Sequence, residues 1–159
     1  MRAKEIVKSQ YRASLAMLRE AIEKCPDPLW EDVGYSNPFW HVAYHVIFYT
    51  HLYLHPTEED FVPWEKHRDG IVSLGDSVEG EMPFSKEDIL EYLDLCLEQM
   101  EEQVDAMNLE AASGFYWLPF DKLELQFYNI RHVQQHTGEL CERLGAHGEI
   151  EVNWVGMVT

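Results

Sequence analysis

Hydrophobic residues recur every three or four positions along four segments of the chain, which is the spacing of one face of a helix. The first segment runs from about Ala3 to Lys24, and the turn sequence CPDP at 25–28 ends it. The second opens at Asn37-Pro38, a capping residue followed by a proline, and continues to about Leu54. Because this second segment is apolar almost all round, we expect it to be buried inside the fold.

The third and fourth segments begin with capping sequences. Ser85 opens the third helix, whose apolar stripe continues to Met107. Asp121 opens the fourth helix, which we expect to end at Leu144 because Gly145 is a natural stop. The chain has no alternating strand pattern of any length, so the predicted fold class is all-α.

Residues 56–84 connect the second and third helices and show no hydrophobic period. This connection is far longer than two antiparallel neighbours need, and it could cross the whole length of a bundle. The second and third helices could then run parallel. We therefore predict a four-helix bundle that forms a single domain over residues 1–159, with a long crossover between helices 2 and 3.

The formal net charge of -17 limits the partners to expect. Such an acidic surface repels nucleic-acid phosphates and anionic lipids, so we expect neither nucleic acid nor a membrane as a partner. The charged start MRAKEIVKSQ lacks the apolar stretch of a signal peptide, and the most apolar window, residues 38–54, is short for a membrane span. Three cysteines without a CxxC spacing do not indicate a disulfide framework, so we expect a reduced, cytoplasmic protein.

The chain has eight histidines, and six of them form pairs with a spacing of four, where a random distribution would give roughly 0.4 pairs. Two side chains four residues apart lie on one helix face, where both can bind one ion. We expect His51 and His55, at the end of the second helix, to lie near solvent. The three pairs are His41 and His45, His51 and His55, and His132 and His136.

Spacing alone leaves the chemistry of these pairs open, because a histidine on an apolar helix face is more often a satisfied core residue than a ligand. The chain has no HExxH, no ExxH, no GxSxG and no glycine-rich phosphate loop. Zincins, di-iron carboxylate bundles and the corresponding hydrolase and nucleotide sites are therefore excluded. The metal centre that stays compatible with the sequence is a histidine-only site open to water.

The run RHVQQHTGEL resembles the last helix of the DinB/YfiT-like superfamily, and NPFWHVAYHVIFYTHLYL is similar to its second helix. The ending NWVG also looks like that of one branch. The resemblance covers nearly the whole chain and implies a four-helix bundle in up-down-down-up order. It further implies one divalent metal, usually nickel or zinc, on three histidines with water in the remaining positions. The matching residues are His45, His132 and His136, which leaves His41, His51 and His55 as non-ligands.

Two positions depart from the family pattern. Many members have a further histidine just before the last ligand, where this chain has Gln135. The glutamine that follows the glycine is here Glu139, one helical turn from His136. Glu139 could orient a ligand by accepting a ring N–H, or act as a base on metal-bound water. It could equally be a surface carboxylate paired with Arg143 at i+4.

The resemblance implies metal-activated thiol chemistry, so the first functional hypothesis is a divalent-metal-dependent thiol (S-)transferase. Its partners would be a small-molecule thiol and an electrophile. The alternative is a non-catalytic, stress-related bundle protein that binds metal or has lost it and acts as a homodimer. The aromatic segment 111–120 could serve as a dimer interface or as a lid over the metal.

Overall fold

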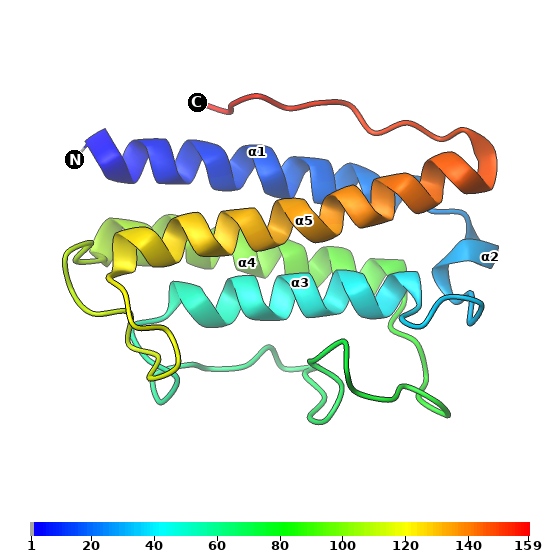
Figure 1. Cartoon of the computed structure of the whole chain (residues 1–159), viewed down its shortest axis with the longest axis horizontal. Coiled ribbons are helices and arrows are strands. Elements are labelled where there is room, and N and C mark those ends of the chain that lie inside the picture. The colour runs from blue at the N-terminus through cyan, green and yellow to red at the C-terminus, as the bar shows by residue number, and fades with distance from the viewer. Residues whose placement is uncertain (1) are drawn as a thin grey trace.

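The structure, a computed structural model, describes residues 2–159, and these residues form helices and loops without a strand (Figure 1). The all-α fold class is therefore confirmed. Among the same residues, no helix combines the length and the apolar character that crossing a bilayer requires. The five helices are α1 (Arg2–Lys24), α2 (Asp27–Trp30), α3 (Phe39–Leu54), α4 (Lys86–Ala106) and α5 (Lys122–Gly148).

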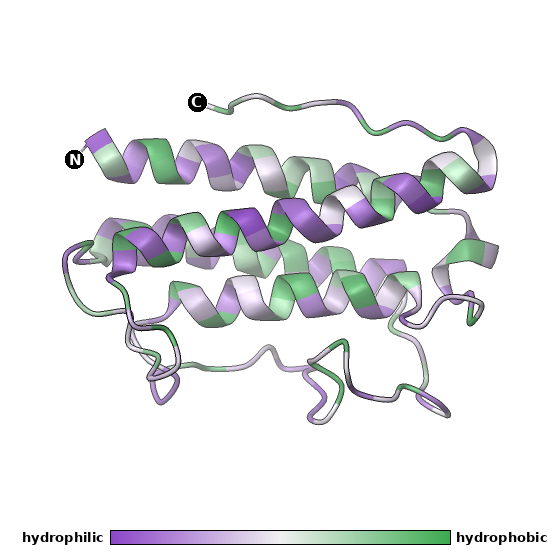
Figure 2. Cartoon of the chain, in the orientation of Figure 1, coloured by the Kyte–Doolittle hydropathy of each residue, from purple (hydrophilic) through white to green (hydrophobic). Residues whose placement is uncertain are grey.

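The four long helices pack in a closed ring. Both α1 and α3 contact α4 and α5, and Figure 1 shows α5 lying between α1 and α3. Hydrophobic and hydrophilic residues form bands along α1 and α5 in Figure 2, as expected for helices with one buried face. The contact between α3 and α5 matters for function, because these two helices carry the candidate ligands.

Helix α3 is buried along its whole length, as its apolar sequence predicts, and Tyr49 is its one residue that is only partly buried. The crossover residues 55–85 run beside the bundle along α3 (Figure 1) and insert Trp64, Ile71 and Phe84 into the core. The long connection is therefore a further neighbour of α3, beside α4 and α5. It is not merely a link between helices.

The predicted helix starts hold for two helices and fail for one. Ser85 accepts a hydrogen bond from the backbone N–H of Asp88, at 3.0 Å, and Asp121 caps α5 in the same way. At α3 the capping residue is Pro38, and no side chain caps this end. The prediction of an Asn37 cap is wrong by one residue. The Asn37 carbonyl instead accepts a hydrogen bond from Arg143 on α5.

The predicted end of α5 is also wrong, because the helix continues through Gly145 to Gly148. A glycine inside a helix costs only about 1 kcal/mol relative to alanine, which tertiary packing can offset. The left-handed residue that ends α5 is Glu149, with φ at 57°, and Ile150 then packs on the core. The short helix α2, within the turn after α1, was not predicted.

Candidate metal centre

Three histidines from two neighbouring helices meet at one point of the bundle. His45 comes from α3, and His132 and His136 come from successive turns of α5. One ring nitrogen from each residue lies within 4.8 Å of the other two. Among residues 2–159, no other group of three or more histidine, cysteine, aspartate or glutamate side chains is placed to hold an ion. The histidines that the sequence singled out are thus brought together.

Two of the three rings have a fixed tautomer. Nδ1 of His45 lies 2.7 Å from the carbonyl oxygen of Val72, which can only accept, so this nitrogen carries the proton. Nδ1 of His136 lies 3.0 Å from Oε2 of Glu139, and a carboxylate also accepts. In both rings the Nε2 atom is therefore left with its lone pair, as metal ligation requires.

The third ring faces the first. Nε2 of His132 lies 3.1 Å from Nε2 of His45, and Nδ1 of His132 is buried without a hydrogen-bond partner among residues 2–159. Two imidazole lone pairs that converge on one point repel each other unless a proton or a cation lies between them. Imidazole nitrogen is a favoured ligand of zinc and nickel, so this donor set fits a divalent ion of that kind.

Burial keeps the converging rings neutral. It is the main reason why the pKa of His45 falls to about 4 and that of His132 to about 3. The neighbouring imidazoles act in the same direction, and the hydrogen bond to the Val72 carbonyl opposes the shift at His45. At neutral pH these rings therefore carry no charge. A neutral ring with a free lone pair is the form of histidine that binds a metal.

Glu139 makes both contacts that its position in the sequence suggested. Its Oε2 accepts the His136 N–H, and its Oε1 accepts a hydrogen bond from NH2 of Arg143 at 2.6 Å. The same guanidinium donates to the carbonyl of Asn37 at 2.7 Å and lies over the ring of Tyr35. A chain of contacts therefore runs from the segment before α3 to the ring of His136.

The other α3 histidines lie outside the cluster, as expected of non-ligands. His41 is fully buried and donates from Nε2 to the carbonyl of Ile71 at 2.7 Å. His51 and His55 lie at the far end of α3, and the expectation that they reach solvent as surface residues is wrong. The crossover covers them, and Phe61 packs edge-on against both rings.

Two neighbours of the site, Tyr49 and Val72, were not predicted as such. Tyr49 places its ring 4.9 Å from that of His45 and 6.0 Å from that of His132, and it is partly exposed. Its spacing of four from His45 is a signal that could have identified it. Val72 acts through its backbone carbonyl, and no side-chain pattern identifies such a residue.

The aromatic segment 111–120 packs at the end of α3 and contacts Tyr53, two helical turns beyond His45. Phe115 is buried with its ring 5.0 Å from that of Tyr53, while Trp117 donates to the Tyr53 hydroxyl at 3.3 Å. Tyr116 is 92% exposed. The segment is therefore anchored on Tyr53, and it leaves the rings of Tyr116 and Trp117 exposed.

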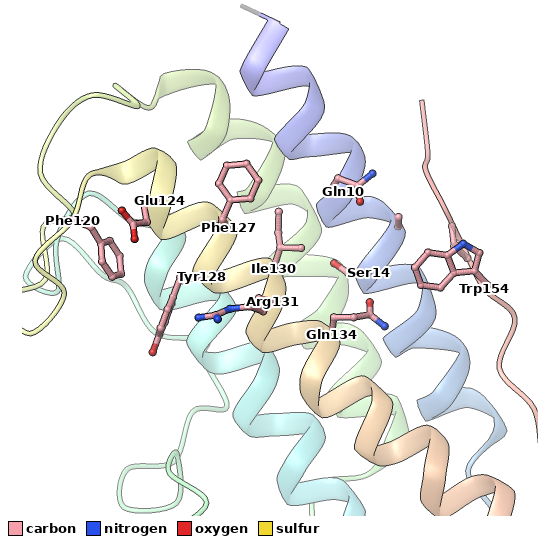
Figure 3. Close-up of a pocket in the computed structure, with 12 residues that line it drawn as sticks. Gln10, Ser14, Phe120, Glu124, Phe127, Tyr128, Ile130, Arg131, Gln134 and Trp154 are labelled. Carbon is pink, nitrogen blue, oxygen red and sulfur yellow. The ribbon is translucent and has the colours of Figure 1, made fainter.

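A separate groove of about 550 Å³ lies where α1, α5 and the C-terminal tail meet (Figure 3). Phe127 and Trp154 are exposed at its edge, and Ser14 and Gln134 lie between them. None of the three clustered histidines lines this groove. The candidate metal centre is therefore a distinct feature on the α3 side of α5.

Comparison with known proteins identifies the family of the chain. The family model of the DinB superfamily matches residues 10–140, which is most of the chain and includes both helices that carry the clustered histidines. No curated protein and no solved structure gives a significant match. On the family match and the three-histidine cluster, the chain belongs to the DinB superfamily.

Proposed function

We propose that this protein is a divalent-metal-dependent enzyme that transfers a small thiol to an electrophile at the site of His45, His132 and His136. The observation that carries the proposal is the convergence of three imidazoles, two of which have Nδ1 bound to a fixed acceptor. Three histidine ligands leave coordination positions for a substrate, which is the arrangement of catalytic centres. Zinc and nickel both suit this donor set.

Access to the site supports a catalytic role. His132 and His136 are only partly buried, and the His136 side chain is 12% exposed. Part of the His136 ring therefore lies at the protein surface, as a site that takes a substrate requires. When bound, a divalent ion supplies Lewis acidity, which lowers the pKa of a thiol or of water in contact with it.

The surrounding residues position the rings. Val72 holds the proton of His45 on Nδ1, and Glu139 does the same for His136. Both carboxylate oxygens of Glu139 are engaged, one by His136 and one by Arg143. We assign Glu139 to orientation of His136, since a base would need a carboxylate oxygen free to accept a substrate proton. Tyr49 forms an aromatic wall beside the rings.

The proposal includes the cellular setting. We propose a cytoplasmic homodimer with its long helices in up-down-down-up order, acting on a small-molecule thiol and an electrophile. The net charge of -17 supports the exclusion of nucleic acid as a partner. The exposed rings of Phe127 and Trp154, which line one groove, support self-association, because large apolar side chains that gather on a surface are typical of contact regions.

The test is a thiol-consumption assay with tag-free protein. Glutathione, bacillithiol and mycothiol are each supplied with a chromogenic electrophile, and the wild type is compared with His132→Ala. The control is His147→Ala, an exposed histidine on the same helix. We expect metal-dependent turnover that His132→Ala removes and His147→Ala retains. A metal-loaded protein inert with all three thiols would contradict the transferase and favour the non-catalytic, dimeric alternative.

A further inference from the structure

A second pair of histidines lines a cavity at the far end of α3. His51 and His55 are 2% and 6% exposed, and both face a cavity of about 660 Å³. The cavity lies between the last turn of α3, one face of α4 and the crossover residues 60–65. It is separate from the three-histidine cluster, which contributes none of its lining residues.

Both rings present a free nitrogen to this cavity. Nδ1 of His55 donates to the carbonyl of His51 at 2.8 Å, so Nε2 of His55 is an acceptor. Nδ1 of His51 contacts the hydroxyl of Tyr92 at 3.1 Å. No hydrogen bond joins either Nε2 atom to another described residue. Since the two side chains are otherwise buried, the cavity is the space that these nitrogens reach.

The charged side chains that line the cavity are all acidic. Its lining includes the carboxylates Asp60, Glu65, Glu91 and Glu102 and contains no lysine or arginine. The carbonyl end of α3 adds the negative end of a helix dipole. These groups all favour a cation over a neutral or anionic ligand.

An ammonium group already occupies the edge of this region. Nζ of Lys66 lies 2.5 Å from Oε2 of Glu91 and 2.9 Å from Asp88, and it lies 5.7 Å from the centre of the Trp64 ring. Trp64 also lines the cavity and stacks on Tyr92. The side chains at the edge therefore recognise a primary ammonium by carboxylate contact and by an aromatic face.

We propose that this cavity binds a small organic cation with primary ammonium groups, such as an aliphatic diamine. One ammonium donates to Nε2 of His55 at the inner end, and the other reaches the lining carboxylates that do not pair with Lys66, which are Asp60, Glu65 and Glu102. The apolar walls formed by Val62, Trp64 and Leu95 contact the aliphatic chain. A metal ion is a poorer occupant, because these imidazoles and carboxylates do not form a group of three within ligand distance.

The experiment is calorimetric titration of the metal-loaded protein with 1,4-diaminobutane at low salt. His55→Leu should weaken binding about tenfold or more, because it removes an acceptor from a charged donor. Glu102→Gln should weaken binding about threefold, as expected of one exposed charge. Glu98→Gln is the matched control, an exposed carboxylate on α4 that does not line the cavity. Circular dichroism verifies the fold of His55→Leu, and Glu102 is on the surface, where substitution leaves the core intact.

Saturable binding of the diamine that weakens most in His55→Leu, less in Glu102→Gln and not in Glu98→Gln would support the proposal, provided that uncharged 1,4-butanediol does not bind. Equal weakening by Glu98→Gln and Glu102→Gln would show general attraction to an acidic surface and would overturn it. Binding of butanediol as tight as that of the diamine would also overturn it. Displacement of the diamine by zinc, with zinc binding that depends on His55, would overturn it as well.

Discussion

Nε2 of His45 and Nε2 of His132 lie 3.1 Å apart, although the two residues are 87 positions apart in the chain. His45 keeps its proton on Nδ1 through Val72, so His132 has two available states. A proton on Nε2 of His132 gives a hydrogen bond between the rings. A proton on Nδ1 leaves both Nε2 lone pairs directed at one point, as a cation requires. The fold therefore holds a pair of donors that a single ion can join.

Glu139→Gln should weaken metal binding by about 10- to 100-fold, because the amide no longer fixes the proton and the orientation of His136 with a charged acceptor. The measurement is competition for zinc or nickel with a chromogenic chelator. Glu142→Gln is the control, an exposed glutamate on the same helix. If both variants retain wild-type affinity, Glu139 is only the surface partner of Arg143.

His51 should make the protein less stable in mild acid. Burial lowers its pKa from the ordinary value of 6.5 to about 3, so the unfolded chain binds a proton between these values and the folded chain does not. Stability is therefore lost as pH falls below 6.5, by about 1.4 kcal/mol for each pH unit.

Urea unfolding at pH 7 and pH 5 tests this dependence. The free energy of unfolding of the wild type should fall by about 2 kcal/mol more than that of His51→Gln, in which the titrating group is absent. A substitution at the exposed His147 is the control and should follow the wild type. Identical losses in the wild type and His51→Gln would refute the contribution of His51.

Gly145→Ala should raise the free energy of unfolding by about 0.5 to 1 kcal/mol. The residue is inside α5, and a Cβ there would meet no atom within 4 Å. Gly114→Ala is the opposite case. Gly114 has φ at +88°, and its added Cβ would lie 1.9 Å from the carbonyl oxygen of Pro56. That variant should lose more than about 2 kcal/mol. A lower unfolding temperature for Gly145→Ala than for the wild type would contradict the helix end observed at Gly148.

Most of the fold could be predicted from local signals. The helical period and the caps at Ser85 and Asp121 act within a few residues, so one sequence shows them directly. The end of α5 could not be predicted in this way. Gly145 is compatible with both a stop and a continuing helix, and the packing of Ile150 after the real end decides between them.

The candidate site, too, could be predicted only in part from local signals. The pair on α5 follows from spacing, whereas the choice of His45 over His41 came from the family resemblance. Both α3 histidines are buried, and both donate to successive carbonyls of the crossover, those of Ile71 and Val72. The difference is that α5 lies opposite His45. The hydrophobic periodicity of α3 does not predict this contact, because the contact depends on how the two helices pack.

Elemental analysis of tag-free protein as isolated, wild type beside His132→Ala and His147→Ala, tests the metal centre most directly. We expect about one zinc or nickel ion per chain in the wild type and in His147→Ala. We expect almost none in His132→Ala, with unchanged helix content by circular dichroism. Full metal retention in His132→Ala, or a wild type without metal that binds none when zinc and nickel are supplied, would contradict a metal centre at these histidines.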